Sequence, residues 1–474
     1  MDSFSAFIAN ANGILWGYIL IILLLGAGIY FTVATRFIQF RRFRKAVSTM
    51  LGSRKTTHVK QISSFQAFCT SMAARVGTGN LAGVAVALYL GGAGAIFWMW
   101  VVALLGMATS LIENTLAQVY KTNNGDGTFV GGPAFYMQKA LKARWMGILF
   151  SVALIIAYGF AFNSVQANTI ANSLHDTWGL SKWGTGIVIA MITAFVISGG
   201  IRSISKVAEL LVPFMASAYL IVALIVILIN ITAVPAVLLL IVKSAFGLEQ
   251  AAGGAIGVAI MNGVKRGLFS NEAGMGSAPN AAATAAPQPN HPASMGFIGM
   301  LGVFTDTIII CTATAFIILL SGVLTPANGV EGILLTQSAL AAEVGEWGRG
   351  FISLAVLLFA FTSIIGNYYY GESSLRFIKD NKALLWLFRA SVVVFIIIGS
   401  VQELSIVWNF ADLSMAVMAI INLTAILLLS KIAFTVLKDF EEQIDSGQEP
   451  SFDKSKYPTI NNTADDDIWT GNKK

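Results

Sequence analysis

The stretch Arg266-Gly-Leu-Phe-Ser-Asn-Glu-Ala-Gly-Met-Gly-Ser277 interrupts an apolar segment that begins near residue 251. A second glycine-rich run, Ala74-Arg-Val-Gly-Thr-Gly-Asn80, interrupts the apolar segment 63–90. Backbone inside a bilayer must satisfy its own hydrogen bonds, so irregular chain at that depth survives only within protein or beside a water-filled cavity. A pair of glycine-interrupted apolar segments in the two halves of a chain is typical of the binding site of a secondary transporter.

The composition predicts an all-α polytopic membrane protein. Of the 474 residues, 56% are hydrophobic and only 11% are charged, and the mean hydropathy is +0.74. A soluble domain carries about 25% charged residues. The net charge of +6 resides in loops between apolar segments, so it indicates a lipid bilayer and no nucleic acid as the partner.

Because one helix needs roughly 20 apolar residues to cross a bilayer, we expect about eleven spanning helices. They lie near residues 14–34, 63–90, 93–119, 146–172, 184–200, 207–230, 251–278, 294–321, 350–370, 384–401 and 405–436. The apolar segments 234–246 and 329–344 are shorter, and we expect them at the outer surface rather than across the membrane.

The orientation follows from the basic loop after the first span. Residues 36–60 contain eight Lys or Arg and no acid, and such loops lie in the cytoplasm. The N-terminus is then outside, and an odd number of spans leaves the C-terminus in the cytoplasm of a cell bounded by a plasma (bacterial inner) membrane. The polar tail 438–474 is expected to be disordered.

The chain divides into four parts. Residues 1–62 form an N-terminal helix with the basic loop, and 438–474 form the cytoplasmic tail. Residues 63–230 and 251–437 each hold five spans that open with a broken helix. An odd number of spans per copy turns the second copy upside down, which predicts a 5+5 inverted repeat with a midplane site.

The first break offers groups of both signs without an ionised side chain. Gly77 and Gly79 let backbone N–H groups approach a ligand, and the helix that begins near Thr78 favours a carboxylate. The helix that ends near Val76 leaves free carbonyls for Na⁺ or an ammonium group, and Asn80 adds a neutral oxygen. The alternative is that these glycines only allow close helix packing.

The second break places Ser270, Asn271 and Glu272 beside the substrate. The large apolar side chains of Phe269 and Met275 would then limit the size of a substrate side chain. Packing of both residues against neighbouring helices is the alternative.

Ionisable residues inside spans are functional candidates, because a charge in lipid is costly. Arg75, Glu113 and Asp306 are such candidates for charge coupling, together with Glu272. The alternatives are pairing of Arg75 with Asp306 or Glu113, and capping of a half-helix by Glu272.

The span 350–370 carries a candidate ion site. The hydroxyls of Thr362 and Ser363 with the carbonyl of Phe359 would form an oxygen-rich Na⁺ site opposite a broken helix. Bonding of these hydroxyls to their own helix is the alternative. The run 368–370, three tyrosines, is typical of an interfacial aromatic belt.

The sequence contains no enzyme motif. It has no phosphate-binding loop and no His/Cys cluster with metal spacing, and Cys69 and Cys311 lie in apolar segments where buried thiols are expected. We therefore expect neither enzymatic activity nor a cofactor, and the energy for transport would come from an ion gradient.

These motifs resemble those of the alanine or glycine:cation symporter family (sodium:alanine symporters). The resemblance rests on Arg75-Val-Gly-Thr-Gly-Asn-Leu-Ala-Gly-Val84, on Gly263-Val-Lys-Arg-Gly-Leu-Phe-Ser-Asn-Glu-Ala-Gly-Met-Gly-Ser-Ala-Pro279 and on Asp306-Thr307. It implies the LeuT-type inverted-repeat fold of the amino acid–polyamine–organocation superfamily with one extra N-terminal helix. It also implies Na⁺-coupled uptake of alanine or glycine by alternating access.

The same resemblance implies roles for individual residues. The substrate carboxylate would bind at Thr78, Gly79 and Asn80, and the amine at carbonyls near Ala74 and in the second break. One Na⁺ would bind the carbonyls of Ala73, Val76 and Phe359 and the hydroxyls of Thr362 and Ser363. Ser270 with Asn80 would mark a second ion position.

Two other functions remain open from the sequence. Proton-coupled amino-acid symport could use Glu113, Glu272 or Asp306. A cation channel also needs irregular backbone, but it usually gathers its filter from repeated copies around one axis.

Overall fold

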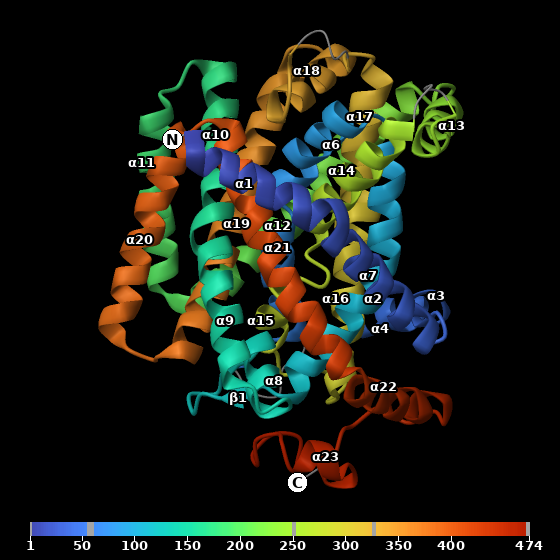
Figure 1. Cartoon of the computed structure of the whole chain (residues 1–474), viewed down its shortest axis with the longest axis vertical. Helices are drawn as coiled ribbons and strands as arrows, with labels where there is room; N and C mark the ends of the chain where they lie inside the picture. The colour runs from blue at the N-terminus through green and yellow to red at the C-terminus, as the bar shows by residue number, and fades with distance from the viewer. Residues whose placement is uncertain (1, 55–60, 249–252, 325–328, 471–474) are drawn as a thin grey trace.

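The computed structural model describes residues 2–54, 61–248, 253–324 and 329–470. Its elements are helices apart from one small hairpin of β1 (Thr122–Asn123) and β2 (Phe129–Val130) (Figure 1). The all-α prediction for the spanning part is confirmed.

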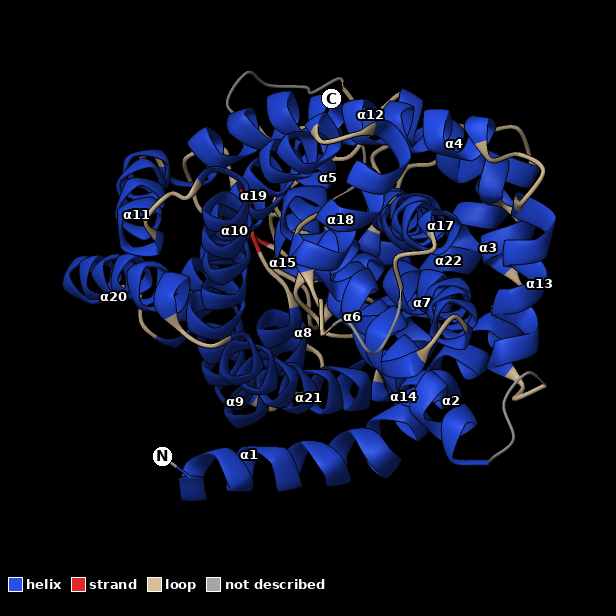
Figure 2. Ribbon diagram, turned by 90° about the horizontal axis from the view of Figure 1, so that it is seen from above, coloured by secondary structure: helices blue, strands red, loops and turns tan. Residues whose placement is uncertain are grey.

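The spanning helices form the body of the molecule (Figures 1 and 2). The first span joins α1 (Asp2–Ile14), η1 (Leu15–Ile19) and α2 (Leu20–Ala34), and the short helices α3 (Ile38–Arg41) and α4 (Phe43–Leu51) follow it. The unbroken spans after these are α7 (Gly94–Val119), α9 (Arg144–Leu154) continued by η3 (Ile155–Ala161) and α10 (Phe162–Trp178), α12 (Gly200–Ile229), α16 (Pro292–Val303) continued by η4 (Phe304–Cys311) and α17 (Thr312–Ser321), α19 (Trp347–Ile378), α20 (Lys382–Val401) and α21 (Leu404–Leu428).

Eight helical stretches of the described residues are long and apolar enough to cross a membrane, or nine with one bent pair. The expected count of eleven is therefore not confirmed. The two other expected spans correspond to α11 (Lys182–Ser198), which has only 17 residues, and to α14 (Gly253–Asn271), whose apolar character is diluted by Lys265 and Arg266.

The bundle has two ends. The N-terminus and α18 (Ile333–Val344) lie at one end, the α18 end, while α8 (Pro133–Lys139), the hairpin and the C-terminal residues lie at the other, the tail end (Figure 1). α13 (Val234–Ala245) and α18 have 12 residues each and are too short to cross a bilayer. The hydroxyl of Thr336 on α18 donates to the carbonyl of Leu81 at 3.0 Å, so α18 covers the half of the first broken helix that faces this end.

Polarity is distributed as expected for a protein that lipid surrounds. Large apolar side chains on the peripheral helices α11 and α20 are exposed, including Phe195 (82%) and Trp386 (65%) (Figure 2). The charged side chains of Arg75, Glu113 and Asp306 are instead buried between helices. Charges inside the bilayer are stable only in such surroundings.

Both predicted breaks are present, but the second is shorter than predicted, because residues 266–271 belong to α14 and only residues 272–277 are irregular. In the first, α5 (Ser64–Arg75) is separated by three residues from η2 (Gly79–Gly83) and α6 (Val84–Gly91), and the two halves are bent by 48°. In the second, α14 ends before the irregular residues 272–277 and the short α15 (Ala278–Ala282). The second break contains three residues with positive φ, at Glu272 (59°), Gly274 (90°) and Gly276 (80°), which end the helix. The division into two inverted copies stays a prediction.

The expectation that residues 438–474 are disordered is wrong for the described part of the tail, up to residue 470. α22 (Ser430–Asp445) turns away from α21, and η6 (Lys454–Lys456) and α23 (Pro458–Asn461) follow it beneath the bundle (Figure 1). Trp469 is only 7% exposed. Polar composition suggested disorder, but a few large apolar side chains and specific ion pairs order the chain.

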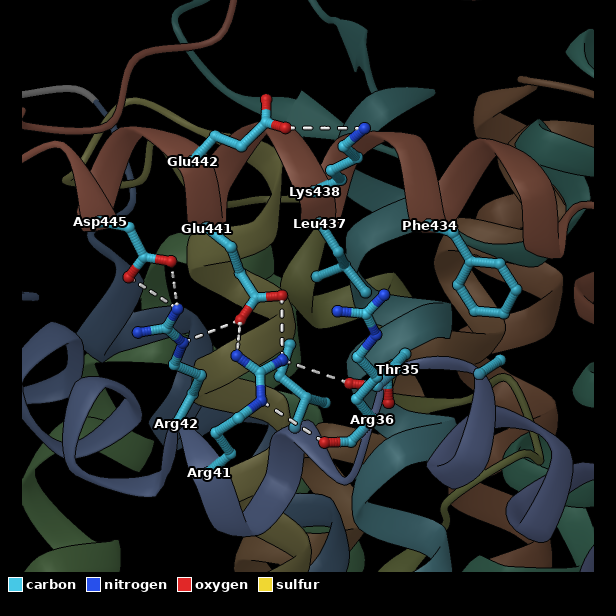
Figure 3. Close-up of a pocket in the computed structure, with 12 residues that line it drawn as sticks. Thr35, Arg36, Arg41, Arg42, Phe434, Leu437, Lys438, Glu441, Glu442 and Asp445 are labelled. Carbon is cyan, nitrogen blue, oxygen red and sulfur yellow. Dashed lines mark hydrogen bonds and ion pairs between the residues drawn. The ribbon is translucent and has the colours of Figure 1, made fainter.

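Ion pairs fix α22 against the basic loop. Arg41 and Arg42 both bond the carboxylate of Glu441, at 2.6 and 2.8 Å, and Arg42 also bonds Asp445 at 2.6 Å. Figure 3 shows these pairs along a groove of about 510 Å³ between the end of α2 and α22. A network of bidentate pairs is worth more than isolated surface pairs, so it directs the tail under the bundle.

The expected aromatic belt at residues 368–370 is also wrong. Tyr368 and Tyr370 are fully buried and Tyr369 is 5% exposed. The hydroxyl of Tyr368 donates to the carboxylate of Glu372 and accepts from Arg389 Nε at 2.8 Å. These rings pack inside the protein because α19 runs through the centre of the bundle.

Candidate functional site

Gly79, directly after the first break, contacts the last turn of α14, directly before the second break. A Cβ atom at this position would lie 3.1 Å from the ring of Phe269 and 3.2 Å from Ser270 Cα. Only glycine allows this approach without displacement of the second break. The predicted juxtaposition of the breaks is therefore present.

The backbone N–H groups of the first break donate hydrogen bonds to the oxygens of side-chain amides. The Gly77 N–H donates to Asn80 Oδ1 at 2.9 Å, and the Thr78 N–H donates to Gln166 Oε1 at 3.1 Å. The hydroxyl of Thr78 is buried and has no hydrogen-bond partner among the residues that the structure describes. A buried polar atom without a partner is costly, so this position is suited to a ligand. Gln166 was not among the residues predicted for the site, although an amide within an apolar span was a usable signal.

Asp306 joins the two breaks to η4. Its carboxylate accepts hydrogen bonds from Asn80 Nδ2 at 2.8 Å, Ser270 Oγ at 2.7 Å and Thr307 Oγ1 at 2.8 Å. The buried thiol of Cys311 lies 3.2 Å from Ser270 Oγ. The site therefore contains one buried acid with three neutral donors.

The candidate Na⁺ ligands also come together. Ser363 Oγ lies 3.0 Å from the Phe359 carbonyl and 3.5 Å from the Val76 carbonyl across the interface with α5. Thr362 Oγ1 donates to the Phe359 carbonyl at 2.9 Å. The expected bonding of these hydroxyls within their own helix is thus present, but Ser363 reaches the first break as well.

Close helix packing makes this contact possible. A Cβ on Gly366 of α19 would lie 3.1 Å from Ala74 N, and Ala73 in the same turn of α5 is fully buried. The described residues contain no cluster of three or more His, Cys, Asp or Glu that could hold a metal ion. Neutral oxygens suit Na⁺ rather than a transition metal.

The alternative for Arg75, an ion pair with Asp306 or Glu113, is not present within the described structure. Its guanidinium is buried and donates to the Gly299 carbonyl at 3.2 Å and to Ser110 Oγ at 3.4 Å. It still interacts electrostatically with both acids from a longer distance. The arginine therefore balances the buried negative charge without contacting either carboxylate.

The polar groups of the second break are largely satisfied by capping. Glu113 accepts from the Gly274 N–H at 3.2 Å, and Glu272 accepts from Ser277 Oγ at 2.7 Å. Asn271 Oδ1 accepts from the Ala273 N–H at 3.0 Å. Glu113 thus caps a backbone N–H group of the second break, whereas Glu272 bonds a side-chain hydroxyl and no backbone N–H among the described residues. Met275 is fully buried in the same turn.

An aromatic layer, formed by Phe162, Phe269 and Trp408, includes a residue that contacts Gly79. Phe269 stacks on Phe162 with centroids 4.7 Å apart and packs against Trp408 at the same distance. The guanidinium of Arg266 lies 4.4 Å above Trp408 and forms a buried ion pair with Asp412 at 2.5 Å. Asp412 was also absent from the residues predicted for the site, although an acid within an apolar span was again a usable signal.

Comparison with known proteins gives one consistent family. The sequence matches the sodium:alanine symporter family over residues 1–454. It is 50% identical to the probable sodium/glutamine symporter GlnT of Bacillus subtilis (strain 168), over 94% of this chain and 92% of that protein. It is 38% identical to the sodium/alanine symporter AgcS of Methanococcus maripaludis, over 93% of this chain and 98% of that protein.

One solved structure supports the fold. The crystal structure of MhsT in complex with L-phenylalanine superposes with a TM-score of 0.54 at 14% identity, covering 78% of this chain and 89% of that chain. This similarity confirms the expected LeuT-type fold and says nothing further about the substrate.

Proposed function

Since this chain belongs to the sodium:alanine symporter family and is a sodium-coupled transporter rather than an enzyme, we propose that it carries alanine or glycine into the cell. The observation that carries this proposal is the contact between Gly79, after the first break, and the last turn of α14, before the second, beside the Thr78 hydroxyl, which has no hydrogen-bond partner among the described residues. Both signs of a zwitterion can be bound there by backbone groups.

The substrate carboxylate would replace side-chain amides. It would accept from the N–H groups of the first break, displacing Asn80 Oδ1 and Gln166 Oε1, and from the Thr78 hydroxyl. A helix N-terminus favours such an anion. The amine would bind the carbonyl of Ala74 and polar groups of the second break, including Ser270.

A small substrate side chain is favoured by the aromatic layer. Phe269 is held between Phe162 and Trp408, so it cannot swing away without breaking two ring contacts. The relative named as a glutamine symporter is more similar in sequence than the one named for alanine. Glutamine is therefore the main competing substrate.

Na⁺ would bind between α5 and α19. Its ligands would be the carbonyls of Ala73, Val76 and Phe359 and the hydroxyls of Thr362 and Ser363. A second cation, or a proton in the proton-coupled alternative, would bind near Asn80 and Ser270, where Asp306 supplies a negative charge.

The tail end would face the cytoplasm of a bacterial inner membrane, because the basic loop lies beside α22. One positive charge that moves through ~100 mV gains about 2.3 kcal/mol. A tenfold Na⁺ gradient adds about 1.4 kcal/mol. Together they suffice to concentrate an amino acid several hundredfold.

Uptake of labelled alanine into proteoliposomes tests the proposal. A Na⁺ gradient, a proton gradient, or neither is imposed, and unlabelled glycine and glutamine are added as competitors. We expect uptake that requires the Na⁺ gradient and competition by glycine. Uptake driven by the proton gradient alone would contradict Na⁺ coupling. Stronger competition by glutamine than by glycine would contradict the proposal that alanine or glycine is the substrate.

A further inference from the structure

The two broken helices are joined at the tail end. Ile62 lies just before α5, and its carbonyl accepts from the Ala286 N–H at 3.0 Å in the segment that follows α15. The same two segments form a short parallel bridge between Ile62 and Ala285. The halves of both broken helices that face this end are thus held together by backbone hydrogen bonding.

The end of α7 clamps this junction. The ammonium group of Lys121 donates to the Ala285 carbonyl at 2.8 Å, and the amide of Gln118 donates to the carbonyls of Ala282 and Ala285 at 2.5 and 3.1 Å. Lys121 is only 3% exposed. Burial lowers the pKa of Lys121 to about 7, and the carbonyl favours its charged form.

Trp469 of the C-terminal tail covers the clamp. Its indole N–H donates to the Gln118 carbonyl at 2.9 Å, and the Lys121 ammonium lies 4.6 Å from the centre of its ring. The ring of Phe129 is 4.1 Å from the same ammonium. Aromatic faces attract a buried cation through the ring quadrupole, so the tail completes the environment of Lys121.

Further contacts fasten the tail in this position. Asp465 forms an ion pair with Lys139 of α8 at 2.8 Å, and the Phe452 N–H donates to the Asn290 carbonyl at 3.0 Å. The pairs of Arg41 and Arg42 with α22 fix the start of the tail (Figure 3). The tail therefore contacts α7, α8 and the segment after α15 at once.

We propose that the tail residues 450–470 lock the tail end of the transporter closed, with Trp469 and Lys121 as the positioning residues of the lock. Alternating access requires that the site open toward this end, and the joined half-helices must then separate or move together away from α7. Contacts made only in the closed state shift the population toward that state. The proposal rests on alternating access by this family and does not depend on which amino acid is carried.

Accessibility of a buried cysteine tests the lock. Ser71 on α5 is 7% exposed and faces Tyr370 of α19, so Ser71→Cys reports separation of these helices. The full-length protein in inside-out membrane vesicles is treated with a membrane-impermeant maleimide, and the parent with its two buried cysteines sets the background. Right-side-out vesicles show whether the tail end faces the cytoplasm.

We expect Trp469→Ala to increase the rate of Ser71→Cys labelling at least threefold. Trp469→Phe, which keeps a ring beside Lys121 but loses the bond to Gln118, should increase it less. Trp145→Ala is the matched control, because Trp145 is 70% exposed at the start of α9. Its labelling rate should equal that of the parent.

An unchanged labelling rate in well-folded Trp469→Ala would overturn the lock. If that variant does not fold, the labelling rate of Ser71→Cys is measured with Asp465→Asn instead. This substitution only weakens the ion pair with Lys139 at the surface of the tail. A faster rate supports the lock, and a rate equal to the parent overturns it. Loss of alanine uptake in the parent would refute the proposed substrate but would leave this readout intact.

Discussion

The two interruptions of the spanning helices differ in how their polar groups are satisfied. In the first break, the N–H groups of Gly77 and Thr78 are held by side-chain amides, and the Thr78 hydroxyl has no partner. In the second break, Glu113 accepts from the backbone N–H of Gly274, and Glu272 accepts from the hydroxyl of Ser277. Exchangeable partners suit a ligand site, and fixed caps suit a rigid wall.

This difference assigns separate tasks to two motifs that look alike in sequence. The first break would bind the substrate and Na⁺, whereas the second would hold a fixed shape beside them. Substitutions in the second break should therefore affect folding first. Substitutions in the first break should affect transport while the protein remains folded.

The largest expected effect is on the stability of the second break. Gly274 has φ of 90°, and a Cβ there would lie 2.9 Å from Leu423. Gly274→Ala should lower the free energy of unfolding by about 2–3 kcal/mol, measured by thermal unfolding in detergent. Gly257→Ala on α14, with no atom within 4 Å of the new Cβ, is the control and should be neutral. Equal stability of the two variants would contradict the rigid wall.

A smaller effect, on transport, is expected at Gly79. Because a Cβ at this position meets Phe269 and Ser270 at 3.1 and 3.2 Å, Gly79→Ala should reduce the initial rate of alanine uptake about thirtyfold, or about 2 kcal/mol. Gly83→Ala in the same segment, whose nearest contact is 3.6 Å away, should retain most of the uptake. Similar uptake rates for the two variants would mean that Gly79 is not part of the substrate site.

The ion site should give a still smaller change. Thr362→Ala combined with Ser363→Ala removes two oxygens between α5 and α19, so the Na⁺ concentration for half-maximal uptake should rise about tenfold, or about 1.4 kcal/mol. Ser391→Ala, which removes an exposed serine bonded within α20, is the control. An unchanged Na⁺ requirement would exclude these hydroxyls as ligands.

The smallest change concerns substrate size. Phe269→Ala opens space beneath Phe162 and Trp408, so competition by leucine or glutamine against labelled alanine should strengthen about fivefold, or about 1 kcal/mol. Phe214→Ala, at an exposed site on α12, should leave the competition profile as it is. Loss of alanine uptake without gain of larger competitors would mean that Phe269 only packs the core.

Much of this architecture was predictable from the sequence. Glycines and polar residues inside apolar segments indicated where both breaks lie. The neighbouring hydroxyls of Thr362 and Ser363 indicated a candidate ion site. Contacts across the bundle were not predictable in this way. Gln166 and Asp412 act through partners 88 and 146 residues away, and no local pattern specifies such distances.

The ordered tail illustrates the same limit. Its composition is polar, and the residues that order it are few, among them Trp469 and Asp465. Their partners lie on α7 and α8, more than 300 residues earlier in the chain. A prediction from average composition gives little weight to a few such residues. It therefore indicated disorder in a segment that specific contacts hold in place.

Binding of labelled alanine to purified Thr78→Val most directly tests the assignment of the first break. The hydroxyl of Thr78 has no hydrogen-bond partner in the described part of the chain, so its removal should leave thermal stability equal or higher. The same change should weaken Na⁺-dependent alanine binding about fivefold, or about 1 kcal/mol, because one bond to the carboxylate is lost. Lower stability with unchanged affinity for alanine would contradict the account.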